Sequence, residues 1–230
     1  MLLHASILKL FSLPYFCVWI FLLLTQYAKA SPLLNTDDTA IVAAHHCQLE
    51  SAIVSAKQAD TAYQVNTACQ LLKGVESSIA YSATDSHSTE TTWSAQLKTV
   101  LKPMDRWGVA TSLLFSQTQT VDGKQNDWFL NVPVEWAALN ERVHVYSNIG
   151  YQHSADQPNL LRWSLATNFA LTPKTSMSLE AFNQDRQAPL AQTVLHYTVI
   201  PDLFTLEASF GQRLDDFRQR FFGFGLSFTP

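Results

Sequence analysis

The sequence predicts an all-β chain that closes into a single antiparallel transmembrane barrel of about 12 strands. Apolar and polar residues alternate with period two through most of residues 47–230, as they do in strands with one apolar face. Charged residues make up 15% of the chain, against roughly 25% in ordinary soluble domains. Part of the surface must therefore face something other than water.

The first 30 residues have the three parts of a secretory signal peptide. Lys9 precedes an apolar run from Leu13 to Leu24, and the segment Ala28-Lys29-Ala30 offers a cleavage site. An uncleaved anchor is the alternative, but it needs about 20 apolar residues and Gln26 ends the run early. Cleavage would remove two lysines and no acidic residue, so the net charge moves from -4 to -6. This charge argues against a nucleic-acid partner.

Residues 31–46 have no sustained period. We expect a mobile periplasmic arm that lies before the barrel or enters its lumen. His45 and His46 stand next to Cys47 and suggest metal ligands, but consecutive strand residues point apart, so no metal is expected. The chain also has no Gly-rich phosphate loop and no spaced Cys and His pattern, so we expect no cofactor.

The barrel region, 47–230, begins with a hairpin whose turn lies near Lys57 to Asp60. Folding the chain there brings Cys47 opposite Cys69, with both on the apolar face. The export signal and the two cysteines left after cleavage predict a disulfide between them. Two free buried thiols are the alternative.

Further apolar ladders follow along the chain. Short connections at 102–106, 139–141, 172–175 and 201–202 alternate with longer polar ones, such as 83–91 and 117–127. Short periplasmic turns and longer outer loops are typical of transmembrane barrels. The ladders cover residues 47–53, 63–71, 75–81, 93–101, 107–115, 128–136, 143–151, 161–171, 177–181, 195–199, 204–210 and 220–228.

Period two does not say which face is inside, because a soluble barrel with an apolar core alternates in the same way. Three observations favour an apolar outside: charge is scarce, tryptophans fall at strand ends, and about 12 strands enclose a lumen too wide for apolar side chains to fill. A secreted β-sandwich with core tryptophans is the alternative. The predicted aromatic girdles are Trp93, Trp128 and Trp163 at the outer ends and Trp107 and Trp136 at the periplasmic ends.

The last strand, residues 220–228, has large apolar residues at even positions and small or polar residues between them. It resembles the closing strand of bacterial outer-membrane barrels. Gly223, Leu226 and Phe228 match that terminal assembly signal, although Thr229 and Pro230 follow it. This resemblance implies the barrel-assembly machinery as a partner.

Three stretches resemble a known family: Cys47-Gln48-Leu49-Glu50 with the later Cys69, residues 163–173, and the ending from 195 to 228. They are similar to the outer-membrane transporter family associated with meta-pathway phenol degradation. The resemblance implies a closed barrel in the outer membrane of a Gram-negative bacterium, in contact with lipids and lipopolysaccharide. It also implies a channel or transporter for small solutes, aromatic or hydrophobic ones among them.

The polar faces supply charges that would line the lumen. Five carboxylates against one lysine and one arginine would make an open pore favour cations. Alternatively, these charges pair across the interior and hold the barrel shut. The predicted lumen residues are Glu50, Glu76, Lys98, Glu135, His144, Arg162, Glu180, His196 and Glu207.

A lipid-modifying enzyme is the competing functional class, and a closed structural or adhesive barrel is the third. His153 and Ser154 bear a vague likeness to the His and Ser of outer-membrane phospholipases and deacylases. Neighbouring residues point to opposite faces of a strand, so His153 is badly placed to activate Ser154. We therefore expect no catalytic residues and no enzymatic activity.

Overall fold

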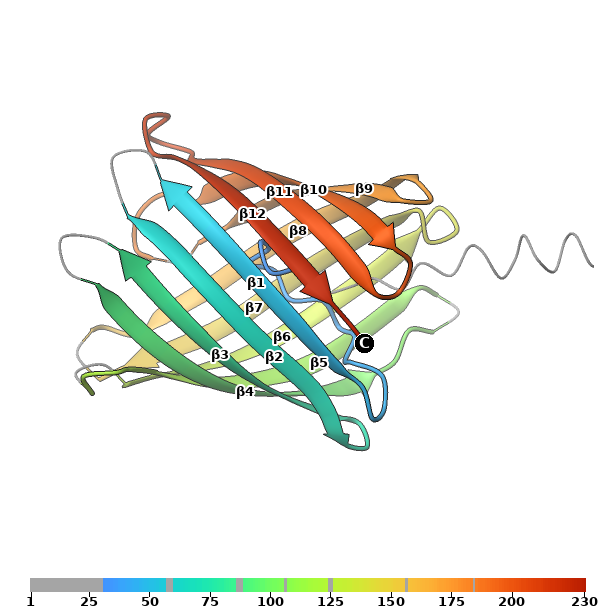
Figure 1. Ribbon diagram of the computed structural model, residues 1–230, viewed down its shortest axis with the longest axis horizontal. Coiled ribbons are helices and arrows are strands. Elements are labelled where there is room, and N and C mark those ends of the chain that lie inside the picture. Colours follow the sequence, from blue (N-terminus) through green and yellow to red (C-terminus); the bar gives the residue numbers. More distant parts are fainter. Residues whose placement is uncertain are drawn as a thin grey trace, which may run out of the picture.

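Twelve antiparallel strands form a closed barrel, which confirms the predicted fold class. The computed structural model describes residues 31–56, 60–85, 89–105, 107–123, 126–155, 157–183 and 185–230. Each strand pairs with its neighbours along the chain, and β1 closes the barrel against β12. Figure 1 shows the tilted strands. They are β1 (Cys47–Ala56), β2 (Thr61–Leu72), β3 (Val75–Asp85), β4 (Glu90–Lys102), β5 (Val109–Thr120), β6 (Asn126–Ala138), β7 (Val143–Ser154), β8 (Leu160–Thr172), β9 (Thr175–Phe182), β10 (Leu190–Ile200), β11 (Phe204–Arg213) and β12 (Arg220–Phe228).

Two expectations fall outside this description. The predicted signal peptide lies wholly outside the described residues, as does most of the predicted turn from Lys57 to Asp60. Within the described ranges, no helix has the length and apolar character needed to cross a membrane.

The barrel is apolar outside and polar inside. Leu97 and Ile149 are 53% and 61% exposed, whereas their chain neighbours Lys98 and Asn148 are each 4% exposed. A water-soluble barrel would bury the apolar members of these pairs instead. The wall is therefore built to face lipid, as in transmembrane barrels.

The predicted girdle tryptophans all lie exposed at the strand ends. Trp93, Trp128 and Trp163 stand near the first residues of β4, β6 and β8, which begin at the same rim. Trp136 is near the end of β6 at the opposite rim, and Trp107 is in the turn before β5. These positions suit the two bilayer interfaces.

The two rims differ in their connections. Turns of two residues, 73–74 and 173–174, lie at the rim where β1 begins and β12 ends, which we call the periplasmic rim. At the opposite, outer rim, the prediction that residues 83–91 and 117–127 form long loops is wrong, because strands occupy most of both segments. Their threonines favour strands, and cross-strand hydrogen bonds extend the ladders beyond the apolar band.

The predicted disulfide is present at the periplasmic rim. Cys47 pairs with Cys69 across β1 and β2, with 4.1 Å between their Cα atoms. Just before it, Ala44 bridges to Gln70 of β2, and the His46 ring nitrogen Nδ1 lies 3.1 Å from the carbonyl oxygen of Pro230. Among the described residues, no group of three His, Cys, Asp or Glu side chains is arranged to hold a metal ion.

The arm, residues 31–46, runs back into the barrel from this rim. Figure 1 shows its blue trace inside the ring of strands. Of the two expected positions for the arm, it therefore takes the one inside the lumen. This placement explains how so wide a barrel is filled with few apolar side chains of its own. The buried arm residues are Leu33, Thr36, Asp38, Thr39 and Val42.

Candidate functional site

Five carboxylates converge on the lumen from strands spread around the barrel. They come from β1, β3, β6, β9 and β11, each on the polar face of its strand. All five are 8% exposed or less, so each must find a partner inside the barrel. We call them the lumen glutamates: Glu50, Glu76, Glu135, Glu180 and Glu207.

The arm supplies a hydrogen-bond donor to four of the five lumen glutamates. Three of these donors are hydroxyl groups and the fourth is a backbone N–H. Read from residue 31 to residue 42, the contacts pass from β11 to β9, β6 and β3, so the arm sweeps across the inner wall. The pairs are Ser31 to Glu207 (2.6 Å), Thr36 to Glu180 (2.5 Å), Thr39 to Glu135 (2.6 Å) and Val42 N to Glu76 (2.7 Å).

The arm also engages Lys98, one of the two basic residues predicted for the lumen. Lys98 Nζ lies 2.6 Å from Asp38 Oδ1, and both side chains are almost fully buried. Asn131 donates to the carboxylate of Asp37 at 2.8 Å. Arg162 lies over the ring of Phe129 with 5.0 Å to its centroid. Lys98 is thus engaged by the arm, which differs from the alternative in which the lumen charges pair across the interior.

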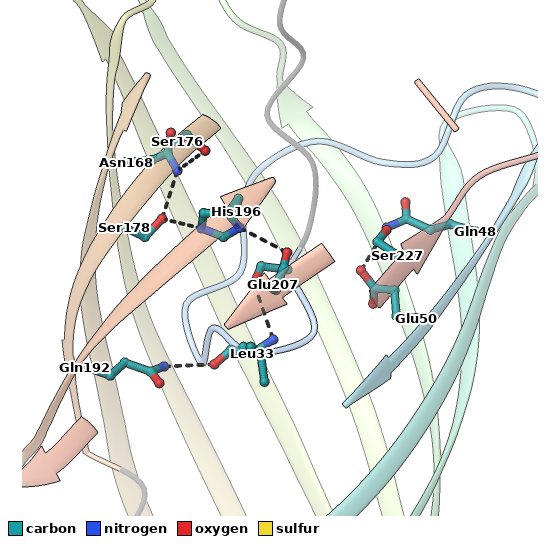
Figure 2. A network of polar contacts seen from close by, with 11 residues as sticks. Leu33, Gln48, Glu50, Asn168, Ser176, Ser178, Gln192, His196, Glu207 and Ser227 are labelled. Carbon is teal, nitrogen blue, oxygen red and sulfur yellow. Dashed lines mark hydrogen bonds and ion pairs between the residues drawn. The ribbon is translucent and has the colours of Figure 1, made fainter. Parts of the chain in front are cut away.

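Two lumen glutamates have histidine partners on neighbouring strands. His144 Nδ1 is 2.8 Å from Glu135, and His196 Nδ1 is 3.0 Å from Glu207. The other ring nitrogen of His196 lies 2.9 Å from the hydroxyl of Ser178. Figure 2 shows this chain of contacts, together with the Gln192 amide that donates to the carbonyl of Leu33 in the arm.

The arm packs against the closing strand β12. A Cβ atom at Gly223 would lie 2.8 Å from Leu33 Cδ2, and one at Gly225 would lie 3.0 Å from Pro32 Cγ. Both glycines therefore let the arm approach the wall more closely than any other residue would allow. The assembly-signal role of Gly223, Leu226 and Phe228 stays a prediction.

Between the arm and the outer rim lies a cavity of about 1030 Å³. Its floor includes Asp38 and Glu50. Glu50 is the one lumen glutamate without an arm donor among the contacts described, and it accepts hydrogen bonds from Gln48 and Asn66 instead. The lumen is thus open to the outer side and filled by the arm further in.

His153 and Ser154, considered as a catalytic pair, contact different partners. His153 Nδ1 is 2.7 Å from Asn159, and its ring packs against Trp128. Ser154 donates to Asp127 at 2.5 Å. Each side chain is therefore engaged in a local contact at the outer end of β6 and β7 and not with the other.

The sequence predicted which strand residues line this site, but it did not predict which of them the arm contacts. The hydroxyl and carboxylate groups of Thr36, Asp37, Asp38 and Thr39 meet partners roughly 60 to 144 residues away. The available signal was the composition of the segment: a run of short polar side chains, rich in hydroxyl groups, beside a chain with five acidic residues on its polar strand faces.

Comparisons with known proteins agree with this architecture. A family model described as "Uncharacterised conserved protein UCP029691" matches residues 19–225. No curated protein matches the sequence. The link to phenol degradation has no support from these comparisons, whereas an outer-membrane barrel has.

Several solved outer-membrane barrels share the fold. The KdgM porin in complex with disordered oligogalacturonate is similar with a TM-score of 0.66 at 9% identity, over 79% of this chain and 98% of that one. The NanC porin gives 0.60 at 12% identity, with the same coverage. An active-site mutant of outer membrane phospholipase A from Escherichia coli gives 0.54 at 14% identity, over 88% of this chain and 94% of that one. The fold is that of outer-membrane barrels, which agrees with the predicted location.

Proposed function

We propose that this chain, which belongs to the UCP029691 family, is an outer-membrane channel for small polar solutes that its own N-terminal arm closes. The observation that carries the proposal is the set of four arm donors bound to four lumen glutamates. A solute can pass only if the arm leaves these contacts.

The contacts of the arm suit a reversible closure. Three of them are hydrogen bonds from hydroxyl side chains to carboxylates, and each contributes about 1.5–3 kcal/mol. Water and a polar solute can replace such bonds one at a time, whereas a large apolar contact has no aqueous substitute. The buried apolar side chains of the arm are Leu33, in a small cluster, and Val42.

The lining of the lumen bears on the solute. The resemblance to the phenol-degradation barrels implied aromatic or hydrophobic solutes. However, the cavity lining combines a dozen apolar side chains with six carboxylates and several amides, and these polar groups favour solutes that form hydrogen bonds. The excess of carboxylates should also favour cations over anions once the arm has moved.

Charge introduced on the arm tests this proposal. In the variant Thr36→Asp/Thr39→Asp, new carboxylates face Glu180 and Glu135, so repulsion should drive the arm from the lumen. The matched control, Ala40→Asp, adds a carboxylate at an exposed position of the same arm. Planar-bilayer recordings of the refolded proteins should show frequent conductance steps for the double variant and rare ones for the control and the unmodified chain. A correctly folded double variant that stays silent would reject the channel.

Hydrolysis is a second candidate function, favoured by one observation. Ser178, His196 and Glu207 are linked in the order of a catalytic triad, with Asn168 donating to the Ser178 hydroxyl at 2.8 Å. A nucleophile must reach its substrate, however, and Ser178 is 0% exposed. Cleavage of a chromogenic acyl ester that is lost in Ser178→Ala would establish this function in place of the channel.

A further inference from the structure

Three of the arm's contacts with the lumen glutamates use alcohol groups. The hydroxyls of Ser31, Thr36 and Thr39 each donate to a carboxylate at 2.5–2.6 Å. These lengths are those of strong O–H···O⁻ hydrogen bonds. Any solute that replaces the arm must offer donors at the same places, and a solute with several hydroxyl groups does so without bringing a charge.

The cavity above the arm has side chains that suit the same chemistry. The cavity wall carries three amide side chains: Gln64 and Asn66 on β2 and Gln96 on β4, with β3 between these two strands. An amide both donates and accepts, so it can bind a hydroxyl group in either role. Within the part of the chain that the structure describes, the side-chain amides of Gln64 and Gln96 form no hydrogen bond, so both are available to a solute.

An apolar surface in the cavity complements these amides. The ring of Phe221 lies over Gly211 on the adjacent strand and also lines the cavity. A ring packed against the wall and lining the cavity in this way can contact the C–H groups of a sugar. The cavity volume of about 1030 Å³ is at the upper end of ordinary ligand sites, about 300–1,000 Å³, so a short oligosaccharide would fit.

The charges of the cavity argue against an anionic solute. Glu50, Glu76 and Asp38 lie in its lining, and the Lys98 ammonium there is already paired with Asp38. At the outer mouth, Arg213, Arg218 and Arg220 are accompanied by Asp60 and Asp216, so the lining as a whole holds six carboxylates against four basic groups. A carboxylated solute would meet repulsion as it approached the arm.

We propose that the cavity binds uncharged polyhydroxylated solutes, short neutral oligosaccharides above all, and that the arm's hydroxyls occupy the places that solute hydroxyls take on the lumen glutamates. The passage of such a solute rests on the proposed channel function. Its binding in the cavity does not, because the cavity is open with the arm in place.

Calorimetric titration of the full-length refolded chain in detergent tests the proposal with two probes, maltotriose and the anionic trimer trigalacturonate. Maltotriose should bind, and trigalacturonate should bind about tenfold more weakly or not at all. The variant Gln64→Ala/Gln96→Ala should lower the maltotriose affinity about tenfold. Gln117→Ala is the matched control, because this glutamine is exposed and lies outside the cavity lining, and it should leave the affinity unchanged.

Absence of maltotriose binding, equal affinity for the two trimers, or an affinity that the double substitution leaves unchanged would each overturn the proposal. These outcomes are separable from failure of the channel. A barrel that conducts after arm displacement but binds no maltotriose would retain the channel and lose this solute class. A barrel that binds maltotriose through Gln64 and Gln96 but never conducts would retain the site and lose the channel.

Discussion

Enlarging Gly223 should unseat the arm, because this glycine makes room for Leu33. In Gly223→Ala the new Cβ atom would lie 2.8 Å from Leu33 Cδ2, closer than carbon atoms approach without displacement. Overpacking of this kind costs about 1–3 kcal/mol. Leu33→Ala removes a side chain that is 5% exposed, and truncation of a buried leucine costs about 2–5 kcal/mol.

The double variant Gly223→Ala/Leu33→Ala isolates the contact between residue 223 and the arm. Shortening Leu33 frees the space that a methyl group at residue 223 needs. The double variant should therefore lose less unfolding free energy than the sum of the two single variants, by on the order of 1 kcal/mol. The new Cβ atom also meets the hydroxyl of Ser209, but this contact is present with and without Leu33 and cancels in the cycle. The measurement is urea unfolding of the four proteins refolded in lipid vesicles, followed by tryptophan fluorescence. If the unfolding free energies of the two substitutions were strictly additive, the contact between Leu33 of the arm and Gly223 of β12 would be refuted.

Three further results are expected. Leu97→Arg, on the lipid face, should cost about 2–4 kcal/mol of unfolding free energy in vesicles, and Gln96→Arg, which faces the cavity, should cost much less; equal costs would mean that the faces are reversed. Arg213 donates to Asp185 and lowers its pKa, so this contact should stabilise the outer loop above pH of about 4 and be lost on further acidification; Asp185→Asn should remove that acid sensitivity of the unfolding midpoint. In the arm-displaced barrel, Glu180→Gln should shift the reversal potential in a salt gradient toward anions, and an unchanged potential would deny this carboxylate a part in selectivity.

The sequence by itself determined the barrel wall. The period of two assigns Leu97 and Gln96 to opposite faces, and the tryptophans at strand ends say which face meets the bilayer. The pairing of Cys47 with Cys69 follows from the same register once the first hairpin is placed. These features are local or concern adjacent strands, so a repeating pattern along the chain is enough to specify them.

Only the tertiary structure decided what fills the lumen. The arm has no period, because its residues form no ladder and each finds a different partner, such as Thr36 with Glu180. A buried carboxylate needs a donor, but its position on a strand does not say which distant segment will supply it. The spacing of Gly223 and Gly225 likewise indicates a strand face, whereas their fit to Leu33 and its neighbour exists only after β12 has closed the barrel around the arm. The wall follows from alternation, and the closure depends on contacts between residues as far apart as Ser31 and Glu207.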